Sequence, residues 1–310
     1  MAFFGYILIS SADEKAKSGI RSMNVYFRLL RPHQYIKNGF VFMPLFFSQN
    51  MDKMDMVYRT SISFICFCMV ASAIYIFNDY MDIEDDQKHP QKRFRPLASG
   101  QAHKKIAMLI GYCLACSGLA LAVWNAVSTT VPLVLYILIN IGYSLRLKNI
   151  AILDVIIVAL GFVCRLFTGA YAAGLPLSHW IVIMTFLLAL FLALAKRRDD
   201  VLIYMSTGEK MRLVIAGYNL QFVDAAMTLM SGIVIVSYIM YCTSENVILR
   251  VGNDNVYLTA LFVVIGIMRY MQIAFVEKNS GNPTRLILKD KILQMTISAW
   301  IITFIVLLYW

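Results

Sequence analysis

Residues 60–86 decide the fold of this chain: Thr60–Phe77, TSISFICFCMVASAIYIF, carries no charge, and Asn78–Asp86, NDYMDIEDD, follows it directly. A helix needs about 20 apolar residues to cross a bilayer. The uncharged run is close to that length, so we predict a membrane helix here. The carboxylates then begin where this helix leaves the hydrocarbon core. The two runs together predict a helix that presents a row of acidic side chains at one membrane surface.

The composition of the whole chain agrees with this prediction. Of 310 residues, 60% are hydrophobic and 15% are charged, whereas soluble domains are about half apolar and about a quarter charged. A water-soluble globule could not bury this much apolar surface. The composition therefore excludes a soluble enzyme, a disordered chain and a secreted disulfide scaffold, and it predicts an all-α, polytopic membrane protein.

The apolar segments predict nine transmembrane helices in one domain, residues 31–310, after an N-terminal cytoplasmic extension, residues 1–30. Residues 1–12 are apolar but have no basic start and no clear cleavage site, so we do not expect a signal peptide. The nine helices are expected near Tyr35–Ser48, Arg59–Asp82, Lys104–Val127, Val131–Leu147, Ile152–Ala172, Trp180–Lys196, Phe222–Cys242, Val256–Val276 and Ile292–Trp310.

The distribution of Lys and Arg tests this count, because both residues concentrate in cytoplasmic loops. With the N-terminus in the cytoplasm, 23 of the 28 basic residues fall in cytoplasmic stretches. A miscounted helix would have scrambled this alternation. The net charge of +10 is therefore a topology signal and not evidence for nucleic-acid binding.

Three carboxylates of the acidic stretch fall on one face of the predicted helix. At about 100° per residue, Asp82 lies about 60° from Asp79, and Asp86 lies about 20° from it. Asn78 lies at the edge of the same side. Carboxylates this close repel one another unless a cation lies among them, and Mg²⁺ binds a few carboxylates together with substrate phosphates. We predict a metal–diphosphate site here; the alternative is a solvated, acidic helix end.

The charge changes sign directly after the acidic stretch. The segment Lys88–Gly100 contains four basic residues, among them Lys92 and Arg95. Such a loop can fold over a metal-bound phosphate, and an arginine can bind two phosphate oxygens at once. An ordinary cytoplasmic loop would explain the lysines but not the carboxylates beside them.

Two further ionisable residues lie within the predicted fifth helix. Asp154 and Arg165 are about 20° from a common helix face, and they follow the basic stretch Tyr143–Lys148. Ionisable residues inside a membrane usually face a polar cavity. The alternative for Arg165 is a structural ion pair that ties helices together.

Polar residues also enter the first predicted helix, where Arg31, Gln34, Lys37 and Asn38 form a cluster. Lys196–Arg198 leaves the sixth helix on the same side of the membrane. We interpret this last run as a topology anchor or as a group that contacts anionic lipid head groups.

At this point the residues resemble a known family. Asn78–Asp86 matches, position for position, the N-D-x-x-D-x-x-x-D motif of the UbiA superfamily of intramembrane prenyltransferases, which have nine helices and use Mg²⁺. The usual second motif of that superfamily, D-x-x-x-D, is half present: Asp154 stands at its start, but Val158 stands at its end.

The chain is most similar to one subgroup, the decaprenyl-phosphate phosphoribosyltransferases, between about Arg31 and Asp200. That resemblance implies transfer of 5-phosphoribose from phosphoribosyl diphosphate (PRPP) to a polyprenyl phosphate in the cell (inner or plasma) membrane, with the active site on the cytoplasmic side. The motifs that carry it are Arg31-Pro32-x-Gln34-x-x-Lys37-Asn38, His89-Pro90-x-Lys92-x-x-Arg95-Pro96-Leu97-Ala98-Ser99-Gly100, Tyr143-Ser144-Leu145-Arg146-Leu147-Lys148, Gly161-Phe162-x-x-Arg165 and Gly174-Leu175-Pro176-Leu177-Ser178-x-Trp180.

The resemblance implies roles for individual residues. Asp79, Asp82 and Asp86 would hold Mg²⁺, and Asp79, Asp82 and Asp154 would act in catalysis. Three partners stay open for Asp154: a ribose hydroxyl, a metal, or Arg165. The residues expected to bind the two substrates are Gln34, Lys37, Asn38, Asn78, Lys92, Arg95, Tyr143, Arg146, Lys148 and Arg165.

Two alternative functions remain. An aromatic prenyltransferase of quinone or haem biosynthesis would share the first acidic motif, but it would be better served by a carboxylate at position 158. A transporter of anionic or lipid substrates would also carry intramembrane charges. Such a transporter would place them near the middle of the membrane, whereas most charges here lie at one rim.

Overall fold

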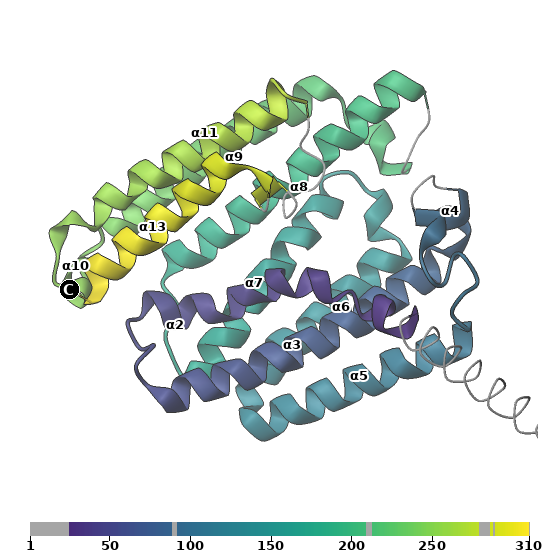
Figure 1. Cartoon of the computed structure of the whole chain (residues 1–310), viewed down its shortest axis with the longest axis horizontal. Coiled ribbons are helices and arrows are strands. Elements are labelled where there is room, and N and C mark those ends of the chain that lie inside the picture. The colour runs from purple at the N-terminus through teal and green to yellow at the C-terminus, as the bar shows by residue number, and fades with distance from the viewer. Residues whose placement is uncertain (1–24, 89–91, 209–212, 279–285, 288, 310) are drawn as a thin grey trace, which may run out of the picture.

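The structure, a computed structural model, describes residues 25–88, 92–208, 213–278, 286–287 and 289–309. Every regular element within these ranges is a helix, which confirms the all-α fold class. The predicted N-terminal extension falls mainly outside the described residues. In Figure 1, α3, α5 and α6 lie on one side of the molecule, α9, α11 and α13 lie on the other, and α7 and α8 lie between them.

Seven helical segments of the described chain are long and apolar enough to cross a membrane. The chain is therefore multi-pass, but the predicted number of nine spans is not confirmed. The last helix, α13, has a shorter apolar stretch, Lys291–Leu307. The seven segments contain α3 (Met54–Met81), α5 (Lys104–Asn125), α6 (Thr130–Leu145), α7 (Leu153–Ala173), α8 (His179–Thr207), α9 (Leu220–Cys242) and α11 (Ala260–Phe275), while α13 spans Lys291–Tyr309.

The first predicted helix, Tyr35–Ser48, is wrong as a continuous α-helix. The chain forms a 3-10 helix, η1 (Pro32–Phe42), and then a short α-helix, α2 (Met43–Phe47). Pro44 has no N–H to donate to Phe40, so an α-helix through this point would lose a hydrogen bond. The N–H of Met43 instead bonds to the carbonyl of Phe40, which is the tighter 3-10 pattern.

Helix α7 lies at the centre of the bundle, packed against α3, α6, α8 and η1. Its approach to η1 is close, because a Cβ added at Gly169 would lie 1.8 Å from the carbonyl oxygen of Val41. Only a glycine leaves room for this contact. The glycine thus brings η1, which carries the first polar cluster, directly against the helix that carries Arg165.

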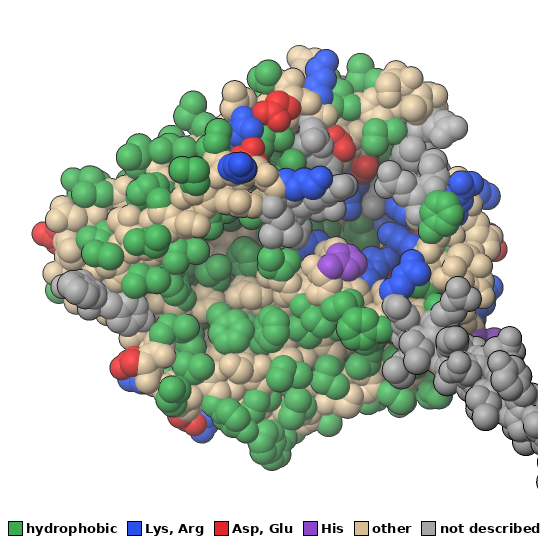
Figure 2. Space-filling view, in the orientation of Figure 1, with side chains coloured by type: hydrophobic (Ala, Val, Ile, Leu, Met, Phe, Trp, Pro, Cys, Tyr) green, Lys and Arg blue, Asp and Glu red, His purple; other side chains and the backbone are tan. Residues whose placement is uncertain are grey.

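An apolar cavity of about 370 Å³ lies between η1, α2, α8, α9, α11 and α13. At one end, Phe46 and Phe47 of α2 pack against Phe304 of α13, with ring centroids 5.7 and 5.2 Å away. Figure 2 shows this face hollowed, with hydrophobic side chains along the hollow and a group of Lys and Arg side chains at its other end. Residues that line the cavity include Phe40, Met43, Met184, Phe191, Tyr270 and Trp300.

Candidate active site

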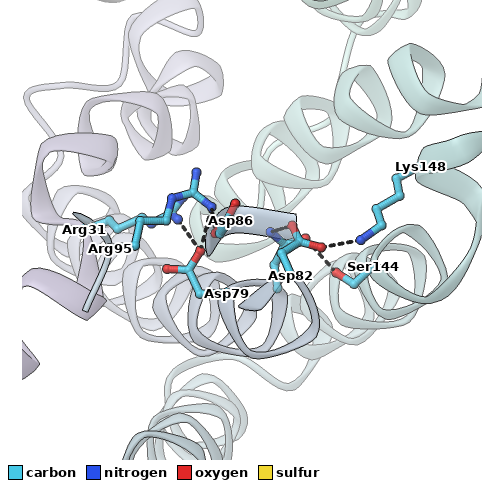
Figure 3. Close-up of polar contacts among 8 residues, drawn as sticks. Arg31, Asp79, Asp82, Asp86, Arg95, Ser144 and Lys148 are labelled. Atoms are coloured by element: carbon cyan, nitrogen blue, oxygen red, sulfur yellow. Dashed lines mark hydrogen bonds and ion pairs between the residues drawn. The ribbon is translucent and has the colours of Figure 1, made fainter. Parts of the chain in front are cut away.

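Two carboxylates of the acidic motif are joined by one guanidinium. Asp79, near the end of α3, and Asp86, in α4 (Ile83–Lys88), are each 2% exposed. Nη1 of Arg95 donates to Asp86 Oδ2 at 2.6 Å and to Asp79 Oδ1 at 3.1 Å, and Arg31 also donates to Asp79 (Figure 3). Burial raises the pKa of Asp86, and the Arg95 charge opposes that rise. These contacts gather the end of α3, α4 and the basic loop around one anionic centre.

The third carboxylate of the motif, Asp82, belongs to a second group of contacts. Lys148 donates to Asp82 Oδ1, and Nδ2 of Asn78 donates to Asp82 Oδ2 at 3.0 Å. Oγ of Ser144, in α6, in turn donates to Asn78 Oδ1 at 3.1 Å. Figure 3 shows Asp82 directed toward Lys148, away from the Arg31 and Arg95 side of the site. This group connects α3 to the connection between α6 and α7.

The prediction that all three carboxylates share one helix face is wrong. Helix α3 ends at Met81, and Asp82 is its C-cap residue, outside the helical conformation. Asp86 belongs to α4, so its angle to Asp79 does not follow from 100° per residue. Tertiary contacts through Arg95 bring Asp79 and Asp86 together in place of helical periodicity.

The cations of the site lie between its carboxylates. Arg31, Arg95 and Lys148 provide three positive charges beside the three carboxylates of Asp79, Asp82 and Asp86. Within the described ranges, no three His, Cys, Asp or Glu side chains lie close enough to hold a metal ion by themselves. The available donors are oxygens, which is the ligand type that Mg²⁺ prefers, with substrate oxygens completing its shell.

Among the other predicted residues of the basic loops, Lys92 interacts with this centre. Lys92 is half-buried and its charge acts on Asp86, while His89–Gln91 lies outside the described residues. Tyr143 is half-buried, and Arg146 is exposed, with a side chain that forms no hydrogen bond or ion pair with the described part of the chain. Gln34, on η1, is half-buried.

Arg165 is buried without a carboxylate. Its side chain is 4% exposed, its Nε donates to Asn38 Oδ1 at 2.9 Å, and its Nη1 donates to the carbonyl of Gly161 at 2.6 Å. Three aromatic rings surround the guanidinium at 4.7–5.2 Å: Phe67, Tyr136 and Phe162. Cation–π contacts of this kind stabilise a cation out of water.

The pair between Asp154 and Arg165, one of three partners left open for Asp154, is wrong. Eleven residues of helix separate them by about 16 Å, because each residue rises about 1.5 Å. Asp154 is fully buried; Arg197 donates to its Oδ2, and the Tyr218 hydroxyl donates to its Oδ1 at 2.6 Å. Both carboxylate oxygens are therefore engaged within the protein.

The role of Arg197 and Arg198 differs from the one predicted for the run Lys196–Arg198. These residues are 3% and 4% exposed, so they are not surface anchors or lipid head-group contacts. Arg197 pairs with Asp200 as well as Asp154, and Arg198 pairs with Asp224 of α9 at 2.7 Å. Asp200 lies three positions after Arg197, a spacing at which opposite charges pair on a helix. This spacing was a signal that the helix continues beyond Lys196, and α8 does continue to Thr207.

The helical bundle, with an acidic motif at the end of α3, the first of its long apolar helices, corresponds to a known family. The UbiA prenyltransferase family matches residues 40–308. The chain belongs to this family. It is therefore a transferase, and the family resemblance seen in the motifs is confirmed.

Curated relatives of this UbiA chain carry a more specific name. It is 31% identical to a decaprenyl-phosphate phosphoribosyltransferase of Mycolicibacterium smegmatis, over 88% of this chain and 89% of the relative. A protein of the same name from Corynebacterium glutamicum is 30% identical, over 91% of this chain and 86% of the relative.

Solved structures show the same fold. A UbiA homolog from Archaeoglobus fulgidus, bound to DMAPP and Mg²⁺, superimposes with a TM-score of 0.67 over 91% of this chain and 98% of that chain. The sequence identity is 17%, so this likeness shows the fold alone.

Proposed function

We propose that this UbiA-family enzyme transfers 5-phosphoribose from PRPP to a polyprenyl phosphate of the decaprenyl type, with release of diphosphate. The product would be a precursor of lipid-linked pentose donors. The names of its 30–31% identical relatives support this substrate pair. Membership of a transferase family sets the transporter alternative aside.

The single observation that carries the proposal is that neither Asp154 nor Val158 offers a free carboxylate where the second acidic motif of the family would stand. A prenyl diphosphate held through two acidic motifs would need carboxylates at 154 and 158. Here both oxygens of Asp154 are engaged by Arg197 and Tyr218, and Val158 is 39% exposed on α7. One acidic motif, interleaved with cations, suits a donor with a single diphosphate and an acceptor that is already anionic.

In the proposed reaction, a phosphate oxygen of the lipid attacks C1 of the ribose. The bond from C1 to the diphosphate oxygen breaks, and the diphosphate leaves with the electron pair. No proton must be removed from the nucleophile, because a phosphate monoester is ionised at neutral pH. The reaction is redox-neutral and requires no general base.

The chain's own residues would bring two anions together. Asp79 and Asp86 on one side and Asp82 on the other would hold Mg²⁺ together with diphosphate oxygens, and the metal would supply neutralisation of charge on the leaving diphosphate. Arg31, Arg95 and Lys148, which now neutralise these carboxylates, would be free to donate to diphosphate oxygens once the metal takes over that role. The alternating positive and negative groups therefore suit a metal and a diphosphate arriving together.

The lipid tail would lie along the apolar cavity between η1, α8, α11 and α13. We propose that the site faces the cytoplasm of a cell membrane, where water-soluble PRPP is available, because 23 of 28 basic residues fall on that side of the predicted topology.

A second candidate is an aromatic prenyltransferase, because the chain carries the complete first acidic motif, Asn78–Asp86, that such enzymes of the UbiA family share. Purified enzyme with Mg²⁺ would be offered polyprenyl phosphate and labelled PRPP in one reaction, and prenyl diphosphate and 4-hydroxybenzoate in another. We expect label on the lipid in the first reaction alone. Product in the second reaction alone would refute phosphoribosyl transfer.

A further inference from the structure

The buried and half-buried cations of the site fall into two groups according to their partners. Arg31, Arg95 and Lys148 each pair with a carboxylate of the acidic motif. Lys37 and Arg165 lie beside one another through Asn38, and neither pairs with a carboxylate of the described chain. We call these two residues the unpaired cations.

Arg165 has capacity for a further anion. A guanidinium has five N–H groups, and the described residues accept from Nε and Nη1, leaving Nη2 without a hydrogen bond. Ionisable groups inside a membrane protein normally pair or face a polar cavity, because an isolated charge is costly there. The three aromatic rings reduce this cost but supply no negative charge.

Lys37 makes the deficit of negative charge larger. It is half-buried on η1, and the charges of Arg165 and Arg31 lie close enough to repel its ammonium group. Its side chain makes no hydrogen bond or ion pair with the described residues. Two like charges held together without an acid form a site of positive potential, which favours an anion of charge near −2.

This positive site adjoins the apolar cavity. The ring of Phe162, which lies against the Arg165 guanidinium, is 5.0 Å from the ring of Phe40. Phe40 lies on η1, three residues after Lys37, and lines the cavity. A ligand with an anionic head and an apolar tail could therefore contact the unpaired cations and the cavity at the same time.

We propose that Lys37 and Arg165 bind the phosphate of the acceptor lipid, a phosphomonoester with an apolar tail, while the ion-paired acidic cluster receives the donor diphosphate. This assignment rests on the proposed function for the identity of the donor. Separate cation sets for the two substrates would lower the repulsion between nucleophile and leaving group. The lipid phosphate would keep unbound oxygens for attack on the ribose.

The first test measures lipid binding alone, without PRPP or Mg²⁺. Polyprenyl phosphate is titrated against purified enzyme in detergent, with polyprenol and inorganic phosphate as probes that lack the charge or the tail. We expect Lys37→Gln to weaken polyprenyl phosphate binding about tenfold or more, as expected from loss of one contact to a charged group. Binding of polyprenol should not change.

Lys105→Gln is the matched control, because Lys105 is an exposed lysine near the start of α5 that forms no ion pair with the described chain. It should bind the lipid as the wild type does. Arg165→Gln tests the second cation, but its loss from the aromatic cage could unfold the protein. Lys37→Gln removes no hydrogen bond or ion pair with the described residues, and its melting temperature is measured beside lipid binding, so this variant is the decisive one.

The second test separates the two substrates kinetically. Lys37→Gln should raise KM for the lipid and leave KM for PRPP near its wild-type value, whereas Lys148→Gln should raise KM for PRPP. An unchanged lipid affinity in Lys37→Gln, or a rise confined to KM for PRPP, would overturn the assignment. Equal affinity for inorganic phosphate and polyprenyl phosphate would also overturn it, because the tail would then contribute nothing. Charge-dependent lipid binding without any transfer from PRPP would refute the proposed donor and leave this site standing.

Discussion

Replacement of Gly169 by alanine tests whether η1 must lie directly against α7. The added Cβ would lie 1.8 Å from the Val41 carbonyl oxygen and 2.7 Å from its carbonyl carbon. Both atoms are backbone, so neither can turn aside as a side chain does. Real Cβ contacts are essentially never below 3.0 Å, so η1 must move by about 1.2 Å or more.

The expected cost follows from this displacement. Overpacking of a tight contact costs about 1–3 kcal/mol, of which the better helix propensity of alanine returns at most about 1 kcal/mol. The effect on turnover should be larger, because η1 carries Lys37 and Asn38. A misplacement of about 1 Å in a substrate-positioning group can lower a rate about 100-fold.

The assay compares thermal unfolding in detergent with the rate of phosphoribosyl transfer. Gly232→Ala is the matched control, because Gly232 also lies within a membrane helix, α9, and no atom lies within 4 Å of its added Cβ. We expect this control to retain activity and to unfold at an equal or higher temperature. If Gly169→Ala matched the wild type in both measurements, the close packing of η1 on α7 would be refuted.

Four further substitutions test three acidic residues and Val158. Asp82→Asn should abolish Mg²⁺-dependent transfer while the protein stays folded in detergent, because an asparagine oxygen can still accept from Lys148 or Asn78 at this helix end; near wild-type turnover with Mg²⁺ would contradict the metal assignment. Asp154→Asn should destabilise the protein by about 1–3 kcal/mol, because buried Arg197 loses one carboxylate but keeps its pair with Asp200. A loss of turnover at unchanged melting temperature would instead support a catalytic Asp154. Asp224→Asn should lower the stability less than Asp154→Asn does, because the Asp224 side chain is 35% exposed. Val158→Asp should not create prenyl-diphosphate transfer, because Val158 is 39% exposed and its neighbour Asp154 is already paired; product from prenyl diphosphate and 4-hydroxybenzoate would show otherwise.

Composition and hydrophobic pattern were sufficient for the fold class and for most helices. An apolar run such as Thr60–Phe77 has one stable solution in a bilayer, because the backbone must satisfy its hydrogen bonds within the segment. The first segment failed this argument, because Pro44 and the close contact with α7 impose a 3-10 helix. The predicted end of α8 at Lys196 was wrong as well. A run of Lys and Arg has the same sequence pattern whether its side chains are hydrated at the surface or paired with buried carboxylates.

The motifs identified which residue types the site contains, but not their partners. Asn78, Asp79 and Asp82 were predicted together with Arg95 and Lys148, and the structure brings these residues into contact. Their metal and substrate roles stay predictions. The omission of Arg31 from the predicted site and the expected Asp154–Arg165 pair both reflect contacts between distant parts of the chain, which local periodicity does not encode.

The sequence alone determined that this chain is a helical membrane protein with an acidic and basic rim, because hydrophobic segment length and charge order are local properties. Only the tertiary structure decided which cations of the site pair with carboxylates and which do not. Packing of η1 on α7 leaves Lys37 and Arg165 without an acidic partner among the described residues, while the turn at Asp82 separates its carboxylate from those of Asp79 and Asp86. Electrostatic energy depends on distance and burial, and both are set by which helices meet.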